Sequence, residues 1–329
     1  MTSMQEFDCD GLTDPGKVHG INDDQFLIAD LHKSIFVHKT SVGFEDHAPI
    51  FGGTQGQLWM VADGGGGWTA ERQASEMAVQ TIAQYLLNMM TWLYRLDIQH
   101  EDDFIDDLTT AIERCQDRVQ TIAEAANVPR DVNTALTMAY INWPRLYVVN
   151  IGNCRCYLLR RAVLQQITTD QTLEPPLGGN GAVQETDDAA PRLSQVLWNV
   201  MHGEAEALHP EVHKAGLQPG DVLLLCTDGL TKHLTDEDIQ RCLQAREPAQ
   251  DTCQKLIALA NQAGGTDNIT VIVARMGRET QSVDEVLEEL DTIEITQTPD
   301  EVVETAQEDV TVSPVGRTGY PRKAGHSVT

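Results

Sequence analysis

Three acidic residues, each within two positions of a glycine, stand at the ends of strongly apolar runs, and this pattern constrains the chain most. Asp63 follows LWMVA, Asp228 follows VLLLCT, and Asp267 directly precedes NITVIV. A single aspartate near glycine is an ordinary turn signal, but three at the ends of predicted buried strands indicate a shared purpose. If these strand ends meet at one rim of packed sheets, the carboxylates repel one another unless a cation neutralises them. Oxygen ligands of this kind favour Mg²⁺ or Mn²⁺ over zinc.

Strands and helices come in blocks along the chain instead of alternating. Apolar runs predict strands at Leu58 to Ala62, Ala135 to Ile141, Arg145 to Val149, Arg155 to Leu159, Val222 to Cys226 and Ile269 to Ala274. Helical periodicity predicts helices at Thr69 to Trp92, Asp102 to Ala126, Asp236 to Gln244 and Gln250 to Gln262. Such blocks are typical of antiparallel sheets with helices packed outside. We therefore expect an α+β layered body and not a doubly wound parallel sheet.

The composition disfavours several functions. The chain has 50 acidic and 23 basic residues, and its net charge of -27 opposes binding to nucleic-acid phosphates. No apolar run approaches the roughly 20 residues that a membrane helix needs, and the first residues lack the features of a secretory leader. The seven cysteines form no CxxC pair, which predicts reduced thiols. We therefore expect a cytoplasmic protein with no nucleic-acid and no membrane partner.

A globular body is expected to end near Arg278. Twelve acids and no Lys or Arg occur between Glu279 and Asp309, and so much charge with little to bury is typical of a disordered tail. We therefore divide the chain into a domain, 1–278, and an acidic tail, 279–329. Within the domain, the Gly-, Pro- and acid-rich stretch from Pro175 to Ala190 predicts an exposed loop or part of a flap.

Six motifs follow one another between Gly16 and Met276: GINDD, VADGGGG, NTALTMAYI, IGNCRCYLL, CTDGL and GGTDNITVIV. In this order they resemble the motifs of the bacterial-type PPM (PP2C) family of metal-dependent protein phosphatases. An ordered series is far more specific than one short pattern. The resemblance implies a four-layer αββα sandwich, in which two antiparallel sheets pack face to face and helices flank both.

The resemblance also implies a two-metal site. By position, Asp63 would bridge two Mn²⁺ or Mg²⁺ ions, the Gly64 carbonyl would join one site, and Asp228 and Asp267 would complete the other. Asp63, Asp228 and Asp267 are therefore the predicted catalytic residues. The implied reaction is direct hydrolysis of phosphoserine or phosphothreonine in proteins by a water that bridges the two ions, without a phosphoenzyme. Phosphorylated proteins are the implied substrates, and a cognate kinase is an implied partner.

Residues around the metal ions follow from the same motifs. Asp23 and Asp24 would hold metal-bound waters. Asn268, grouped with them, is expected to orient Asp267 and its turn and not to bind metal itself.

The chain departs from the family pattern at three positions. His19 stands where many members carry an arginine that grips the substrate phosphate, and it is either a weaker, pH-dependent phosphate ligand or a solvated loop residue. Gly65 replaces a histidine that animal members place after Asp-Gly. Asn153 replaces an aspartate of IGNCR, so we expect no firm third metal site. The segment from Gln171 to Val200 occupies the place of the bacterial flap, which lies over the active site in relatives.

Other interpretations were weighed against this one. A nucleotide-binding turn after Leu58 is disfavoured because the glycine register fails at Thr69. His209 and His213 are four residues apart, and the segment from Glu211 to Leu217 predicts a strand and not a helix. Residues four apart in an extended chain are about 13 Å apart, so surface histidines are favoured over a metal pair. The serious alternative is a catalytically impaired member of the same family that acts as a binding or regulatory module. The retained Asp63, Asp228 and Asp267 argue against it.

Overall fold

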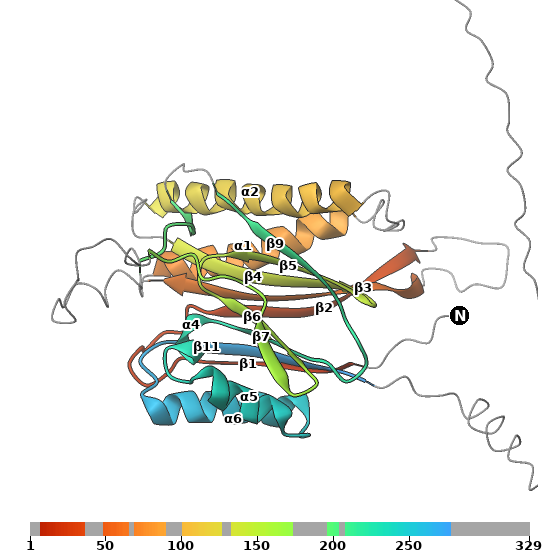
Figure 1. Cartoon of the computed structure of the whole chain (residues 1–329). Coiled ribbons are helices and arrows are strands. Elements are labelled where there is room, and N and C mark those ends of the chain that lie inside the picture. The colour runs from red at the N-terminus through yellow and green to blue at the C-terminus, as the bar shows by residue number, and fades with distance from the viewer. Residues whose placement is uncertain are drawn as a thin grey trace, which may run out of the picture. The chain divides into compact units, whose positions relative to one another are not determined.

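Two antiparallel sheets lie face to face between two layers of helices (Figure 1). The computed structural model describes residues 7–36, 49–65, 69–89, 101–126, 133–173, 196–203 and 208–277. The five-stranded sheet has the order β1 (Phe7–Asp14), β11 (Ile269–Met276), β10 (Val222–Cys226), β6 (Arg155–Arg160) and β7 (Val163–Gln166). The six-stranded sheet contains β2 (Gln25–Phe36), β3 (Pro49–Gly65), β4 (Asn133–Asn142), β5 (Arg145–Ile151) and β9 (Glu211–Gly216), with β8 (Met201–His202) paired to β4.

Helices cover the outer face of each sheet. The long helices α1 (Thr69–Met89) and α2 (Glu101–Ala126) lie on the six-stranded sheet, and α5 (Asp236–Gln244) and α6 (Ala249–Ala263) lie on the five-stranded sheet (Figure 1). A single turn of helix, α4 (Asp228–Thr231), begins directly after β10. The predicted αββα sandwich is therefore confirmed.

Alternate residues of the central strands serve two different cores. On β10, Leu223 and Leu225 face the opposite sheet, whereas Leu224 and Cys226 pack toward the helices α5 and α6. Trp59 of β3 likewise lies between the sheets, and its neighbours on the strand pack under α1 and α2. A strand that is buried on both faces has an unbroken apolar sequence. This burial explains why the runs LWMVA and VLLLC are so apolar.

Strand pairing brings the ends of β10 and β11 together. Cys226, the last residue of β10, is paired with Val271 of the antiparallel β11. Asp228, just after one strand, and Asp267, just before the other, therefore lie at the same edge of the five-stranded sheet. In the facing sheet, Asp63 lies near the end of β3, where it pairs with Ala135 of β4.

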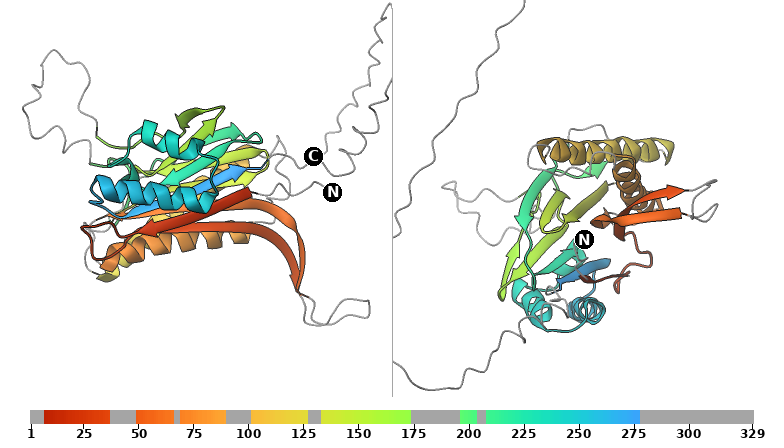
Figure 2. Two further views of the ribbon diagram at one scale, coloured as in Figure 1. Left: turned by 90° about the horizontal axis from the view of Figure 1, so that it is seen from below. Right: turned by 90° about the vertical axis from the view of Figure 1, so that its right-hand side faces the viewer.

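The strands β2 and β3 continue past the rest of their sheet. β4 pairs with β3 only from Gln57 to Gly65, so the first part of β3 pairs with β2 alone. The register between β2 and β3 shifts on both sides of His32, and such irregularities bend a strand pair. Figure 2 shows this bent two-stranded ribbon running away from the sandwich.

The predicted strands and helices correspond to elements of the structure. Strands with more polar sequences were not predicted. The six predicted strands all lie within β3, β4, β5, β6, β10 and β11, and the predicted strand from Glu211 corresponds to β9. The first predicted helix ends at Met89, and residues 90–92 lie outside the described part. The edge strand β1 was not predicted because its sequence, FDCDGLTD, is rich in acids.

Two predictions fall outside the described residues. The acidic tail, 279–329, lies wholly beyond them, and so do residues 174–195 of the predicted flap. The boundary near Arg278 therefore stays a prediction, and all described elements lie within the unit Met1–Thr280. All seven cysteines have free thiols, and six of them are buried. Among the described helices, none has the length and apolar content to cross a membrane.

Candidate active site

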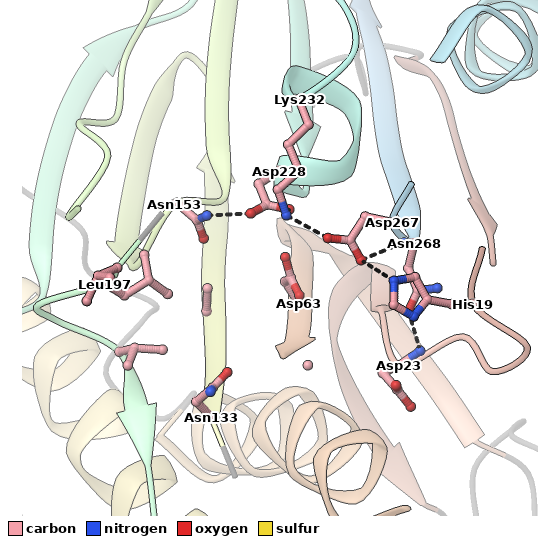
Figure 3. A pocket seen from close by; sticks show the side chains of 14 residues that line it. His19, Asp23, Asp63, Asn133, Asn153, Leu197, Asp228, Lys232, Asp267 and Asn268 are labelled. Atoms are coloured by element: carbon pink, nitrogen blue, oxygen red, sulfur yellow. Dashed lines mark hydrogen bonds and ion pairs between the residues drawn. The ribbon is translucent and has the colours of Figure 1, made fainter. Parts of the chain in front are cut away.

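Side chains from both sheets converge on one pocket of about 480 Å³ at the end of the sandwich (Figure 3). The structure brings together most of the predicted site residues, because the described lining includes His19, Asp23, Asp63, Gly64, Asp228, Asp267 and Asn268, and it also includes Asn153. Asn133, Ala135, Val196, Leu197, Val200 and Lys232 complete it. Acidic residues that are more than 150 positions apart in the chain thus share one cavity. The predicted meeting of strand ends is what the fold produces.

Asp228 is held by contacts on both of its carboxylate oxygens. Asn153 Nδ2 donates a hydrogen bond of 2.6 Å to Oδ2, and Lys232 Nζ lies 2.8 Å from Oδ1. Backbone packing fixes the turn itself, because a Cβ on Gly229 would lie 1.8 Å from the carbonyl oxygen of Asn268. The glycine of the CTDGL motif is therefore required so that the start of α4 can approach β11. Asp228 points into the pocket as a consequence.

Asp267 lies at the rim of the pocket with three groups around it. The amide N–H of Asn268 donates to its Oδ1 at 2.9 Å, and Lys232 Nζ lies 2.6 Å from its Oδ2. His19 Nε2 lies 3.7 Å from Oδ1, and the His19 side chain is 44% exposed. Gly16 packs on the backbone of Asp267 with a φ of +73°, and a Cβ there would lie 2.1 Å from the Asp267 carbonyl oxygen. The turn before β11 thus depends on the loop that carries His19.

Asn268 ties this loop to the site. Its Nδ2 donates to the carbonyl oxygens of Pro15 and Ile21 at 2.9 and 3.1 Å, and its Oδ1 accepts from the amide of Asp23 at 2.8 Å. From the other side, Ser75 Oγ on α1 donates to the carbonyl oxygen of Asp23 at 2.6 Å. The side chain of Asn268 therefore orients the backbone that presents Asp23 to the pocket. These contacts agree with the expectation that Asn268 orients its neighbours. A contribution of Asn268 to catalysis stays a prediction.

Asp24 points elsewhere. It is 3% exposed, it is not among the described residues that line the pocket, and its Oδ2 accepts hydrogen bonds from Thr227 Oγ1 at 2.8 Å and Thr270 Oγ1 at 2.7 Å. The pKa of Asp24 is raised to about 7, first by burial and also by the charges of Asp228 and Asp267, against the lowering effect of the two threonine hydroxyls. In this arrangement Asp24 connects β2 to the strand ends of the other sheet. Its expected role in holding metal-bound water is not seen and stays a prediction.

Asp63 has the most perturbed carboxyl of the pocket. Burial raises its pKa well above the ordinary value, and the charges of Asp228, Asp24 and Asp267 raise it further, whereas Lys232 lowers it. Burial also raises the pKa of Asp23. The neighbouring carboxylate charges therefore disfavour the ionised forms of Asp63, Asp24 and Asp23. Full ionisation of the cluster requires additional positive charge.

Because of the raised pKa of Asp24, the protein without divalent cations is expected to lose stability as the pH rises toward neutral. A carboxyl with a folded-state pKa near 7 binds more protons than its unfolded form between about pH 4 and 7, so the free energy of unfolding falls as the pH rises through this range. One such group contributes at most about 1.4 kcal/mol per pH unit. Urea unfolding in a chelator at pH 5 and 7.5 measures the decrease.

The matched variant for this prediction is Asp24→Asn. Because other acidic residues also repel one another more at neutral pH, the informative quantity is the difference between wild type and variant. We expect a smaller decrease in Asp24→Asn. Equal decreases in the two proteins would show that Asp24 ionises normally in the folded state.

The pocket residues fit divalent cations in their chemistry. Asp63, Asp228, Asp267 and Asp23 supply hard oxygen atoms, and among the described side chains the buried Oδ1 of Asp23 has no hydrogen-bond donor. Among the described residues, however, no three His, Cys, Asp or Glu side chains are grouped closely enough to hold one ion as they stand. Figure 3 shows that the Lys232 ammonium lies between Asp228 and Asp267. The oxygen atoms of the pocket suit divalent cations, but the Lys232 ammonium must move before Asp228 and Asp267 can share one ion.

Comparison with known proteins identifies the class. The model of the protein phosphatase 2C family matches residues 44–269, so the chain belongs to the protein phosphatase 2C family. Its class is that of the protein phosphatases. The matched residues include Asp63, Asp228 and Asp267, whereas His19, Asp23 and Asp24 precede them.

Individual relatives agree with this assignment. The serine/threonine phosphatase Stp of Listeria monocytogenes is 27% identical over 230 residues, which are 70% of this chain and 88% of that protein. The crystal structure of the Mycobacterium tuberculosis serine/threonine phosphatase PstP is 26% identical, with a TM-score of 0.62 over 83% of this chain and 99% of that one. The PstP catalytic domain in complex with two manganese ions gives a TM-score of 0.59 at 25% identity, with 83% and 99% coverage.

Sequence reasoning missed two contacts of this pocket. Asn153 was considered only as a replacement for an acid, whereas its amide is a hydrogen-bond donor to Asp228. Lys232 was not identified at all. Its signal was the spacing, since residues four apart in the helical segment DGLTK share one face. The predicted surface histidines, His209 and His213, are not among the described residues that line the pocket. His213 pairs with Glu211, and the ring of His209 lies 6.5 Å from that of Trp198.

Proposed function

We propose that the chain hydrolyses phosphoserine and phosphothreonine in proteins with the help of two divalent cations. The observation that carries this proposal is the convergence of Asp63, Asp228 and Asp267, from the ends of three strands in two sheets, on one pocket. A site that neutralises these acids with Mn²⁺ or Mg²⁺ gains positive charge where a phosphate must bind. The family membership and the two manganese ions in the structure of PstP support the same assignment.

Four groups would hold the cations: the carboxylates of Asp63, Asp228 and Asp267 and the backbone carbonyl of Gly64. When bound, the ions would supply charge neutralisation to the phosphoryl oxygens and an activated water for direct attack on phosphorus. Asn153 orients Asp228, because its amide donates to Oδ2. Asn268 orients Asp267 and the Asp23 backbone. His19 Nε2 at the rim can donate a hydrogen bond to a phosphate oxygen, although it lacks the paired donors of an arginine.

Direct hydrolysis without a phosphoenzyme is the favoured chemistry. No serine, threonine or cysteine is among the described residues that line the pocket. The thiols of Cys154 and Cys226 are fully buried and have raised pKa values because of that burial, so they are poor nucleophiles. The substrates would be phosphorylated proteins supplied by a cognate Ser/Thr kinase. The catalytic unit would span 1–278 and be followed by the acidic tail.

One experiment tests the proposed function. The full chain is stripped of metals with a chelator and assayed for phosphate release from a phosphothreonine peptide, first in the chelator and then in increasing Mn²⁺ or Mg²⁺. We expect no turnover in chelator and restoration by either cation. Turnover that persists in chelator, or no turnover at any concentration of either cation, would contradict the proposal.

A second candidate function is supported by Lys232. An ammonium within 2.8 Å of both Asp228 and Asp267 already neutralises part of the acidic cluster, as a module without metal chemistry would require. Such a protein would bind phosphorylated partners without hydrolysing them. Phosphopeptide binding in chelator, together with no turnover in Mn²⁺, would favour this function over the first.

A further inference from the structure

Lys232 is placed where a cation of the acidic cluster is expected. Its Nζ lies 2.8 Å from Asp228 Oδ1 and 2.6 Å from Asp267 Oδ2, and Figure 3 shows it directed between the two carboxylates. Lys232 is the only lysine or arginine among the described residues that line the pocket. The ammonium is thus the permanent positive charge of this pocket.

The local backbone fixes this placement. The amide of Lys232 donates to the carbonyl oxygen of Asp228 at 2.8 Å, which closes the turn of α4. Residues four apart on a helical turn share one face, so the lysine stem lies over the aspartate. The ion pair is therefore a feature of the turn that presents Asp228.

A divalent ion and this ammonium exclude each other. Mg²⁺ contacts carboxylate oxygens at about 2.0–2.1 Å, so an ion shared by Asp228 and Asp267 needs the space between them that the ammonium fills. Two cations at that separation would also repel each other strongly. At the other position, the described ion pairs of Lys232 include neither Asp63 nor the Gly64 carbonyl, so an ion there has none of them to break. The two halves of the proposed metal centre therefore differ.

We propose that Lys232 is a resident counter-ion of Asp228 and Asp267 that competes with the second divalent cation. This inference rests on the proposed function. The ion shared by Asp228 and Asp267 must displace the lysine and is therefore the ion whose binding Lys232 weakens, whereas the ion held by Asp63 and Gly64 breaks neither of these ion pairs. The chain consequently needs a higher concentration of Mn²⁺ to complete its centre than the carboxylates alone would require.

The expected size of this effect is moderate. The side chains of Lys232, Asp228 and Asp267 are 35%, 15% and 32% exposed, so solvent screens the two ion pairs and the lysine is displaced at an acceptable cost. Removal of the ammonium is expected to tighten the weaker binding step about tenfold. The tighter step is expected to change by less than about threefold, because no direct contact is lost there.

The test measures Mn²⁺ binding to the full, metal-stripped chain by calorimetry and by the electron paramagnetic resonance of free Mn²⁺. Lys232→Met keeps an apolar stem and removes the ammonium. The matched control is Lys255→Met, which removes the same charge from the surface. Lys255 lies on α6, and its Nζ is 3.3 Å from Glu247 Oε2 in an exposed ion pair. We expect two binding steps in wild type and in Lys255→Met, and a tightened second step in Lys232→Met. The difference should persist in 0.5 M salt, because competition by direct contact is not a long-range screened effect.

The outcomes separate this inference from the proposed function. Two binding steps that are unchanged or weakened in Lys232→Met would overturn the role of Lys232 and leave the phosphatase assignment in place. An absence of Mn²⁺ binding in wild type and both variants would overturn both. If Lys232→Met fails to fold, as judged by circular dichroism, Lys232→Gln provides the same measurement with a side chain that can still hydrogen-bond to the carboxylates.

Discussion

Asp63→Asn is expected to reduce Mn²⁺-dependent phosphatase activity about a thousandfold or more. The substitution removes the carboxylate that is proposed to contact both cations, and metal ions contribute several kcal/mol to stabilising the charge of a transition state. Each 1.4 kcal/mol corresponds to about tenfold in rate, so a loss of about 4 kcal/mol gives this factor. The measurement is kcat/KM for a phosphothreonine peptide at saturating Mn²⁺. Asp228→Asn should behave in the same way.

The same substitution should stabilise the protein when no divalent cation is present. The pKa of Asp63 is raised in the folded state, so above the unfolded pKa this carboxyl weakens the fold progressively as the pH rises toward its folded pKa. A neutral amide of the same size removes that cost. We therefore expect Asp63→Asn to increase the free energy of unfolding in chelator at pH 7.5, although it abolishes activity.

Asp30→Asn is the matched control for both measurements. Asp30 is exposed on β2 and accepts a hydrogen bond from Gln57 Nε2 at 2.9 Å, far from any contact with the pocket residues. We expect its activity and its stability to stay near those of wild type. Full activity in Asp63→Asn would contradict the proposed site, and reduced stability in chelator would show that Asp63 is compensated in the fold by contacts other than a cation.

The sequence was most informative where strands are buried on both faces. The runs LWMVA of β3, VLLLC of β10 and VIVA of β11 are apolar without interruption because each is covered by a sheet on one side and helices on the other. Their ends, and therefore Asp63, Asp228 and Asp267, could be located without a structure. The edge strand β1 could not, because it pairs only with β11 and alternates acids with partly buried residues.

The contacts that tune the site could not be predicted for a different reason. Asp24 and Asp23 are neighbours in the sequence, yet one accepts from Thr227 and Thr270 and the other lines the pocket. Alternation along an extended segment separates adjacent side chains, but only the pairing of β2 with its neighbours decides which of them faces the cavity. The contacts of Lys232 could not be predicted either, because its position depends on how α4 packs against the turn before β11.

Gly229→Ala is expected to destabilise the protein by about 3 kcal/mol or more and to disrupt the pocket. A Cβ at this position would lie 1.8 Å from the carbonyl oxygen and 2.9 Å from the carbonyl carbon of Asn268, and backbone atoms cannot move aside as a flexible side chain can. Relief of the overlap would push α4 away from β11. This movement would separate Asp228 from Asp267 and break the contacts of Asn268.

Urea unfolding and peptide phosphatase activity together measure this effect. A loss of this size is a large fraction of the stability of a typical domain, about 5–15 kcal/mol, so the variant should also be inactive at moderate temperature. Gly20→Ala is the matched control, because it lies in the loop next to His19 and an added Cβ there meets no atom within 4 Å. We expect the control to stay within about 0.5 kcal/mol of wild type. A stable, active Gly229→Ala protein would mean that Asp228 does not depend on the close packing between α4 and Asn268.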